Sequence, residues 1–295
     1  MHKRSNNREP YQGSNPVAKK SLGQNFLRSR KILDAVRDSI HITASDTVLE
    51  VGPGQGDLTT ALLEKAGKVV AIEKDDRLIP FLQEKFKDAV SSNKFSLIHG
   101  DALEFDPSSI SSLSTPVKSA SQDSPNKRIF NGINYKIAAN IPYYITGQFI
   151  RRFLSELKQP TDIALIIQKE VAERIIARDG KQSILSLSIK VYGEPAYIRT
   201  VSRSFFTPAP NVDSAILAIR NISKDFFTEI SEEMFFKVIK TGFASKRKQL
   251  IGNLSSLVSR EHLEQIFRNL HIDLKIRAED MTLEQWREVV KKIHS

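Results

Sequence analysis

From about residue 47 onward, short runs of β-branched and other apolar residues alternate with longer stretches of helical periodicity. The runs lie at 47–51, 68–72, 95–98, 135–139 and 162–168. Strands that alternate with helices in this way indicate a parallel sheet with crossover connections. Two further runs, at 196–202 and 214–221, flank a loop rich in Phe and Pro. We therefore predict an α/β fold with a seven-stranded sheet that is parallel except at its hairpin end.

Two changes in the pattern suggest the domain organisation. The stretch 107–134 is rich in Ser, Pro, Asn and Lys and low in apolar residues, which predicts a long mobile surface insertion. After residue 222 the strand pattern stops and helical periodicity takes over. We expect a main domain at 19–222 and a small helical domain at 223–295, in which Trp286 packs in the core.

The chain is strongly basic, with a net charge of +10 and an isoelectric point near 9.6. Such an excess favours nucleic acid as a partner, and an anionic membrane comes second. Residues 1–31 carry eight Lys or Arg against the single acid Glu9. Residues 1–18 are either a basic arm that contacts RNA or a solvated disordered tail.

Composition excludes several classes of protein. The chain has no Cys, and its six His show no metal-binding spacing, so we expect neither disulfides nor a metal cofactor. No stretch reaches the ~18 apolar residues of a membrane span, and the first residues lack the apolar core of a secretory signal. We expect a cytoplasmic protein that acts as a monomer.

The sequence EVGPGQGDLT follows the first run and places glycines at 52, 54 and 56. Glycines here allow a sharp turn and a close approach of a ligand to the backbone before a helix begins. The spacing is not that of the dinucleotide-binding motif, and no Lys follows to bind a triphosphate. Taken alone, the stretch is either a ligand-binding loop or only a tight turn.

Acidic residues follow the next two runs, at the same predicted edge of the sheet. Glu73 ends the second run, where its carboxylate can accept hydrogen bonds from a ribose diol. Asp101 follows the third run and can accept from the amino group of an adenine, although with Glu104 it could instead cap a helix. Together with Gly52 these acids predict a pocket for an adenosine-containing ligand without phosphates, which describes S-adenosylmethionine.

The sequence NIPYY, at 140–144, ends the fourth run beside this predicted pocket. Pro142 cannot donate to a sheet, so the chain must leave the sheet here. Asn140 and a neighbouring backbone carbonyl can hold an exocyclic amine, and Tyr143 can stack on the base that carries it. The alternative is a strand end whose tyrosines cover the edge of the core; Tyr144 has no assigned role and is a candidate for such a core position.

These motifs, in this order, resemble those of the rRNA adenine dimethyltransferases of the KsgA type over about residues 19–252. The matching stretches are KKSLGQNFL (19–27), LEVGPGQGDLT (49–59), AIEKDDRL (71–78), GDALEFD (100–106), NIPYY (140–144), QKEVAERI (168–175), FFTPAPNVDSAIL (205–217) and FASKRKQL (243–250). The resemblance implies a Rossmann-like class I methyltransferase that uses S-adenosylmethionine to dimethylate two adjacent adenosines near the 3′ end of small-subunit rRNA, with a role in ribosome biogenesis.

Carried over position by position, the resemblance also implies site residues. Contacts to the methyl donor are expected at Asn25, Leu27, Gly52, Glu73, Asp101 and Asn140. Asn140, Pro142 and Tyr143 form the expected catalytic set. For the RNA, Phe206 could face the target base or simply pack in the core, and Lys246, Arg247 and Lys248 could contact phosphates or form a solvated helix face.

The sequence leaves three alternatives to this function. One is an enzyme of the erythromycin-resistance type, which modifies large-subunit rRNA through similar motifs. Another is a non-catalytic ribosome-assembly or nucleic-acid-binding factor on the same fold, and a nicotinamide-dependent oxidoreductase is the third. Two departures from the family bear on the RNA contacts: the stretch 107–134 is long, and SKRK stands where a pair of arginines is more usual.

Overall fold

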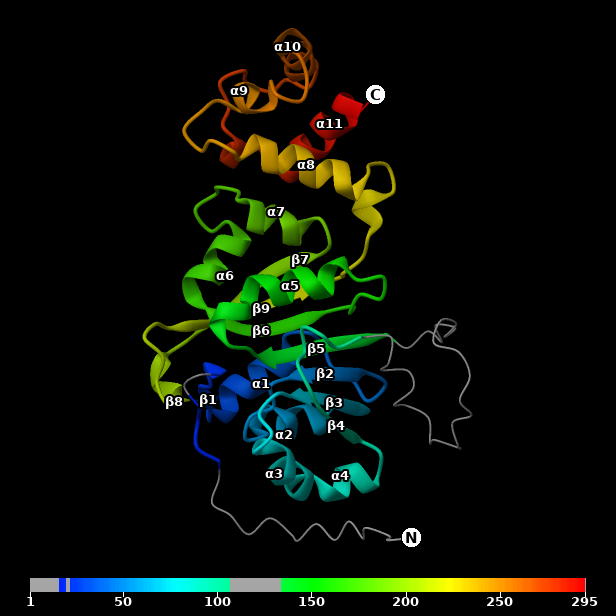
Figure 1. The fold of residues 1–295 in the computed structure, drawn as a ribbon, viewed down its shortest axis with the longest axis vertical. Helices are drawn as coiled ribbons and strands as arrows, with labels where there is room; N and C mark the ends of the chain where they lie inside the picture. The colour runs from blue at the N-terminus through cyan, green and yellow to red at the C-terminus, as the bar shows by residue number, and fades with distance from the viewer. Residues whose placement is uncertain (1–15, 20–21, 107–133, 295) are drawn as a thin grey trace, which may run out of the picture. The chain divides into compact units, whose positions relative to one another are not determined.

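The computed structural model describes residues 16–19, 22–106 and 134–294 (Figure 1). Most of the predicted basic arm and nearly all of the predicted insertion at 107–134 lie outside these residues. By its internal contacts the chain divides into two compact units. Unit 1 comprises 1–144 and 202–211, and unit 2 comprises 145–201 and 212–295. This division cuts through the predicted main domain at 19–222, whose bounds stay a prediction.

Unit 1 contributes four strands of a seven-stranded sheet, in the order β4-β3-β2-β5. All three pairings between them are parallel. The strands are β2 (Thr47–Val51), β3 (Lys68–Glu73), β4 (Phe95–His99) and β5 (Tyr135–Asn140). Each begins and ends within two residues of the run that predicted it, so these predicted strands are confirmed.

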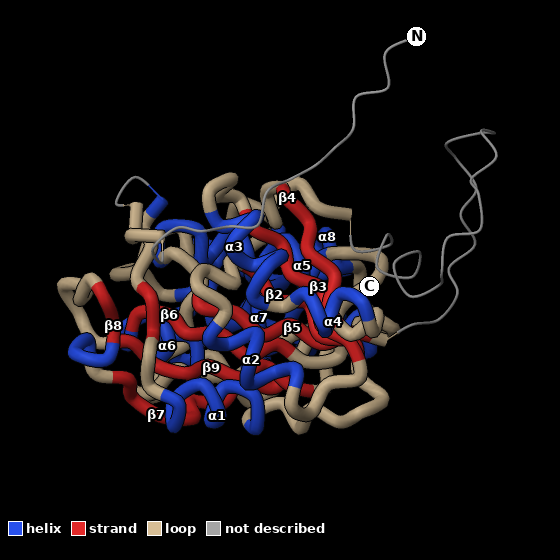
Figure 2. Tube along the Cα trace, turned by 90° about the horizontal axis from the view of Figure 1, so that it is seen from below, coloured by secondary structure: helices blue, strands red, loops and turns tan. Residues whose placement is uncertain are grey.

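One helix of unit 1 precedes β2 in the chain, and the others follow β2 or β3. They are α1 (Arg30–Asp38), α2 (Asp57–Leu63), α3 (Leu78–Lys85) and α4 (Lys87–Ser91). Every residue of β2 and β3 is buried. Continuous burial explains why these runs are mostly apolar and do not alternate with polar residues, as is usual for strands covered on both faces. Figure 2 shows β2 and β3 side by side, as their pairing requires.

Unit 2 contributes the remaining three strands, in the order β6-β9-β7, with both pairings antiparallel. The strands are β6 (Ile163–Gln168), β7 (Glu194–Val201) and β9 (Ser214–Arg220). The expected antiparallel hairpin end of the sheet is therefore confirmed. The antiparallel pairing extends one strand further than expected, because β9 lies between β6 and β7.

Unit 2 also holds seven helices among its described residues. They are α5 (Thr146–Ser155), α6 (Lys169–Ile176), α7 (Ile184–Lys190), α8 (Glu232–Gly242), α9 (Leu250–Leu254), α10 (Arg260–Asn269) and α11 (Leu283–His294). The last four confirm the predicted helical region after residue 222. Trp286 of α11 is fully buried and stacks on Phe243 with ring centroids 5.8 Å apart, so its predicted packing role is confirmed.

Trp286 reaches the last residue of α8, where Gly242 leaves room for its indole ring. We predict that Gly242→Ala destabilises the protein by about 1–3 kcal/mol, because a methyl group there would collide with the ring in a packed core. Urea unfolding measures the change.

Gly252 in α9 is the matched control, since an added methyl group there meets nothing within 4 Å. Gly252→Ala should stabilise the helix by about 0.5–1 kcal/mol, because Ala loses less backbone entropy than Gly. Equal stability changes for the two variants would show that the contact with Trp286 is not what requires Gly242.

Candidate active site

The parallel register brings the carboxyl ends of β2, β3 and β5 together. Val51, the last residue of β2, lies opposite Ile72 on one side and Ala139 on the other. The residues that follow these strands therefore meet at one edge of the sheet, where ligands of open α/β sheets bind. Gly52, Glu73 and Asn140 all lie at this edge, as the sequence predicted.

The loop after β2 turns through glycines at 52, 54 and 56, whose φ angles are +67°, +57° and +80°. Other residues rarely adopt these angles. A Cβ atom added at Gly52 would meet nothing within 4 Å, so there is open space beside this backbone. Cβ atoms at the other two glycines would run into the rings of Phe26 and Phe86. The open side of the loop is thus at Gly52, where a ligand can approach.

Glu73 is buried and holds the glycine loop in place. Its Oε2 accepts a hydrogen bond from the Gly54 amide at 3.2 Å, and its Oε1 accepts one from the Asp75 amide at 2.8 Å. Burial raises the pKa of its carboxyl group. Two carboxylate oxygens offer about four acceptor positions, so further ones remain for the hydroxyls of a ribose.

Glu50 lies two residues before Gly52 and had no role in the sequence analysis. It is fully buried, and the Thr59 hydroxyl donates to its Oε2 at 2.6 Å. Burial raises the pKa of this carboxyl group to about 8, so it is protonated at neutral pH. Because Thr59 belongs to α2, this bond ties the helix after the glycine loop to the strand before it. No periodicity or motif in the sequence indicates that pairing.

Asp101 follows β4 in a turn, where its Oδ1 accepts from the Leu103 amide at 2.9 Å. Its Oδ2 forms an ion pair with Lys74 at 2.7 Å, and the hydrogen bond from Lys74 lowers the pKa of Asp101. No helix begins within the described residues 101–106, so the helix-capping alternative is wrong for this part of the chain. The ionised carboxylate can accept a hydrogen bond from an amino group at the rim.

Asn140 ends β5, and its Nδ2 donates to the backbone oxygen of Asn25 at 2.9 Å. Because this bond uses the amide nitrogen, the side-chain Oδ1 is the atom of this amide that can accept a hydrogen bond from a ligand. Pro142 and Tyr143 follow at the start of a short 3-10 helix, Tyr143–Ile145, and both are partly exposed. Tyr144 is 71% exposed, so the suggestion that it belongs to the core is wrong.

Two short strands bring the expected donor segment next to the loop that carries Phe206. β1 (Phe26–Leu27) pairs antiparallel with β8 (Phe206–Thr207), and Leu27 lies opposite Phe206. The Arg28 amide also donates to the Phe205 oxygen at 3.2 Å. Phe206 is only 4% exposed, which favours the packing role that the sequence left open, while Phe205 is exposed. Stacking of Phe206 on a base stays a prediction.

Lys246, Arg247 and Lys248 lie in unit 2, in the turn between α8 and α9, and all three are exposed. The suggestion of a solvated helix face is therefore wrong, because this stretch is not helical. Asn253 fixes the turn by donating to the Ser245 oxygen at 3.1 Å. Their contact with RNA stays a prediction.

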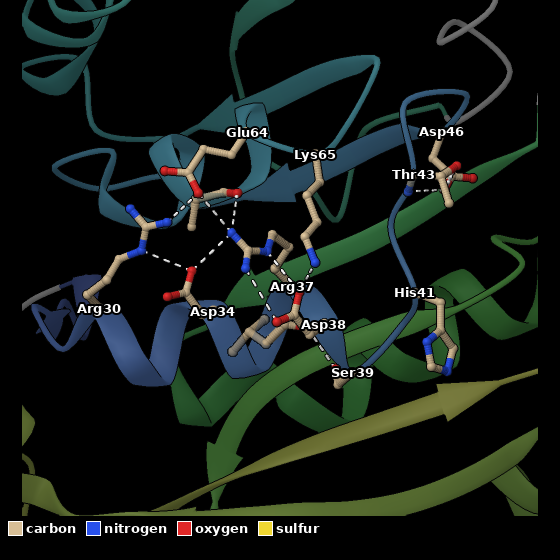
Figure 3. A network of polar contacts seen from close by, with 12 residues as sticks. Arg30, Asp34, Arg37, Asp38, Ser39, His41, Thr43, Asp46, Glu64 and Lys65 are labelled. Atoms are coloured by element: carbon tan, nitrogen blue, oxygen red, sulfur yellow. Dashed lines mark hydrogen bonds and ion pairs between the residues drawn. The ribbon is translucent and has the colours of Figure 1, made fainter.

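A network of charged residues anchors α1, which follows the donor segment directly (Figure 3). Arg37 lies at its centre and is largely buried. Its guanidinium pairs with Asp34 at 3.0 Å and Asp38 at 2.9 Å on its own helix, and with Glu64 at 2.9 Å. Since Glu64 follows α2, the network fastens α1 to the helix that begins at the glycine loop.

We predict that Arg37→Gln destabilises the protein by about 1–2 kcal/mol, because three carboxylates lose a shared partner that is mostly removed from water. The hydrogen bond from Arg37 lowers the pKa of Asp38 from 3.8 to about 2. A carboxyl group whose pKa is lowered by folding stabilises the folded protein at pH values above the ordinary pKa of that group. This stabilisation is lost as the pH falls toward 2. Urea unfolding between pH 7 and pH 2 should therefore show the two proteins converging in acid.

Arg30→Gln is the matched control, because Arg30 pairs with Asp34 and Glu64 from an exposed position. Its loss should destabilise the protein less than Arg37→Gln does, because exposed ion pairs contribute little to stability. A difference between wild type and Arg37→Gln that stays constant down to pH 2 would contradict the role given to Asp38.

Within the described residues no group of three His, Cys, Asp or Glu is arranged to hold a metal ion. No helix among the described residues is both long enough and apolar enough to span a membrane.

A protein-family model and several known proteins match this chain over almost its whole length. The family model described as "Ribosomal RNA adenine dimethylase" matches residues 16–295. "Ribosomal RNA small subunit methyltransferase A" of Dehalococcoides mccartyi (strain CBDB1) is 37% identical over 284 residues, which are 96% of this chain and 90% of that protein.

Two solved structures have the same fold. The 23S rRNA methyltransferase ErmE superimposes with a TM-score of 0.72 at 22% identity, covering 92% of this chain and all of the other. A dimethyladenosine transferase from Plasmodium falciparum superimposes with a TM-score of 0.70 at 24% identity, covering 90% and 95% of the two chains. At these identities the two likenesses establish the fold and no more.

Proposed function

The chain belongs to the ribosomal RNA adenine dimethylase family, and on this premise we infer that it is an rRNA adenine dimethyltransferase that uses S-adenosylmethionine. The small-subunit name of the relative supports small-subunit rRNA as the substrate. We propose two adjacent adenosines near its 3′ end as the targets, as the resemblance of the motifs implies. The observation that carries the proposal is the place of Asn140, which ends β5 at the sheet edge that Gly52 and Glu73 share and uses its amide nitrogen to bind the Asn25 oxygen.

The residues at this edge fit the methyl donor. The space beside Gly52 has room for its amino acid part, and Glu73 and Asp101 offer carboxylates to its ribose and adenine. We propose that Asn25, Leu27 and Asn140 complete its contacts. None of these groups demands a phosphate, in agreement with the glycine spacing. When bound, the donor would supply an electrophilic methyl group that is attached to its sulfonium sulfur, and the sulfur would leave as a neutral thioether.

The target amine is a poor nucleophile, because its lone pair is delocalised into the adenine ring. We propose that Asn140 Oδ1 and the backbone carbonyl near Ile141 or Pro142 accept its two hydrogens, which favours a pyramidal nitrogen. Tyr143 stacks on the base and holds the nitrogen in line for transfer. Oriented carbonyl dipoles stabilise the positive charge that develops on the nitrogen. The methylated amine then loses its proton to water, so no strong general base is required.

We propose that Lys246, Arg247 and Lys248 contact phosphates of the RNA, which would make binding sensitive to salt. The proposed donor and catalytic residues all come from unit 1 of one chain, which supports a monomer as the active form. Since the substrate is ribosomal RNA, we place the enzyme in the cytoplasm.

The first test is methyl transfer itself. Purified protein is incubated with labelled S-adenosylmethionine and either immature small subunits or large-subunit rRNA. The label measures methyl transfer to each RNA, and primer extension locates the methylated bases. We expect label on two adjacent adenosines near the 3′ end of the small-subunit RNA. Label on large-subunit rRNA alone would favour the erythromycin-resistance-type alternative, and RNA binding without any transfer would favour a non-catalytic factor.

We predict that Asn140→Ala lowers methyl transfer by about 100-fold or more, because the amine loses an oriented acceptor of the kind whose removal costs 10²–10³ in rate. Single-turnover assays at saturating donor measure the loss. Donor binding should stay measurable by calorimetry, since the Gly52 and Glu73 contacts remain.

Asn93→Gly is the control, because Asn93 lies in a turn before β4, at the opposite edge of the sheet, where its Oδ1 accepts from Lys68 Nζ at 3.2 Å. Its φ of +59° is one that Gly adopts readily. This variant should transfer methyl groups at the wild-type rate. An Asn140→Ala enzyme with unchanged turnover would show that the amine is held by another group.

A further inference from the structure

Gln24 precedes the expected donor contact Asn25 and uses both ends of its side-chain amide. Its Nε2 donates to Asp75 Oδ2 at 2.9 Å, and its Oε1 accepts from the Lys19 amide at 2.7 Å. Asp75 lies 51 residues further along the chain, in the loop after β3. The side chain therefore joins the N-terminal segment to the loop that follows Glu73.

Asp75 is a rigid partner for this bond. It is only 2% exposed, and Arg77 donates to both of its oxygens, through Nε at 2.9 Å and Nη2 at 2.6 Å. Its backbone amide donates to Glu73 Oε1 at 2.8 Å. The acid that Gln24 contacts is thus one hydrogen bond away from the acid proposed to hold the ribose.

The same N-terminal segment also touches the proposed target-amine site. The Asn25 backbone oxygen accepts from Asn140, as described above. One residue before Gln24, Gly23 has a φ of +64°, and an added Cβ would lie 3.3 Å from the Pro142 side chain and 3.2 Å from the Tyr144 ring. Residues 23–25 therefore lie against the loop after β5 as well as the loop after β3.

We propose that Gln24 is a positioning residue for the methyl donor. Its bond to Asp75 fixes residues 23–27 against the loops after β3 and β5, which both carry proposed donor contacts. Gln24 itself need not touch the donor. It acts through Asn25 and Leu27 on one side and through Asp75 and Glu73 on the other. This inference rests on the proposed use of S-adenosylmethionine at the same edge of the sheet.

A surface hydrogen bond without function would differ in two ways. Its partner would be mobile and exposed, whereas Asp75 is buried and held by Arg77. Its loss would affect folding stability alone, whereas loss of this bond should affect donor binding, because the freed segment carries two proposed donor contacts.

The test uses the full chain and calorimetric titration with S-adenosylmethionine in the absence of RNA. Gln24→Leu should raise the donor Kd about tenfold or more, the effect expected when a hydrogen bond to a charged group is lost. Gln159→Leu is the matched control, because Gln159 is also partly buried and donates from Nε2, in its case to the Leu154 oxygen of unit 2. Its donor Kd should equal that of wild type.

A second variant separates positioning from loss of the side chain. Gln24→Glu keeps the shape and the acceptor for Lys19 but sets a carboxylate against Asp75, so the donor Kd should rise at least as far as in Gln24→Leu. Urea unfolding without the donor shows whether each variant is folded, so that donor binding is compared between folded proteins.

Two results would overturn the inference while leaving the proposed function intact: a Gln24→Leu protein that binds the donor like wild type, or a Gln24→Glu protein that does so. A wild-type protein that binds no S-adenosylmethionine would overturn both.

Discussion

The parallel register of β2 with β3 and β5 is the constraint on which the rest of the site depends. Val51 lies opposite Ile72 and Ala139, so three chain segments leave the sheet at the same edge. A slip of one residue would turn the side chains of β2 to the opposite face and would break the buried hydrogen bond between Thr59 and Glu50. The glycine loop, Glu73 and Asn140 are therefore brought together by packing rather than by contacts of their own.

Polar contacts then fix the side chains that the strand register brings to this edge of the sheet. The Glu73 carboxylate binds the amides of Gly54 and Asp75, so it fixes its own loop and the glycine loop at once. The Asn140 amide donates to the Asn25 oxygen, which settles which end of that amide can receive a substrate amine. Glu73 and Asn140 are thus each held in place by hydrogen bonds to the backbone.

Much of this arrangement follows from the sequence. Apolar runs predicted the strands because buried parallel strands need continuous apolar residues, and strand ends located Gly52, Glu73, Asp101 and Asn140. Contacts between distant segments could not be predicted in the same way. The pairing of β1 with β8, which buries Phe206, depends on the folded path of the chain. The same holds for the bond between Gln24 and Asp75, since neither residue has a distinctive pattern around it.

A crystal structure of the protein with S-adenosylhomocysteine and an adenosine nucleotide tests the proposed site most directly. We predict that the ribose hydroxyls of the bound cofactor product lie within hydrogen-bond distance of Glu73, and its adenine amino group near Asp101. The exocyclic amine of the second adenine should lie within hydrogen-bond distance of Asn140 Oδ1, with Tyr143 against its ring. A cofactor product bound away from Gly52 and Glu73, or an amine turned away from Asn140, would contradict the proposed site.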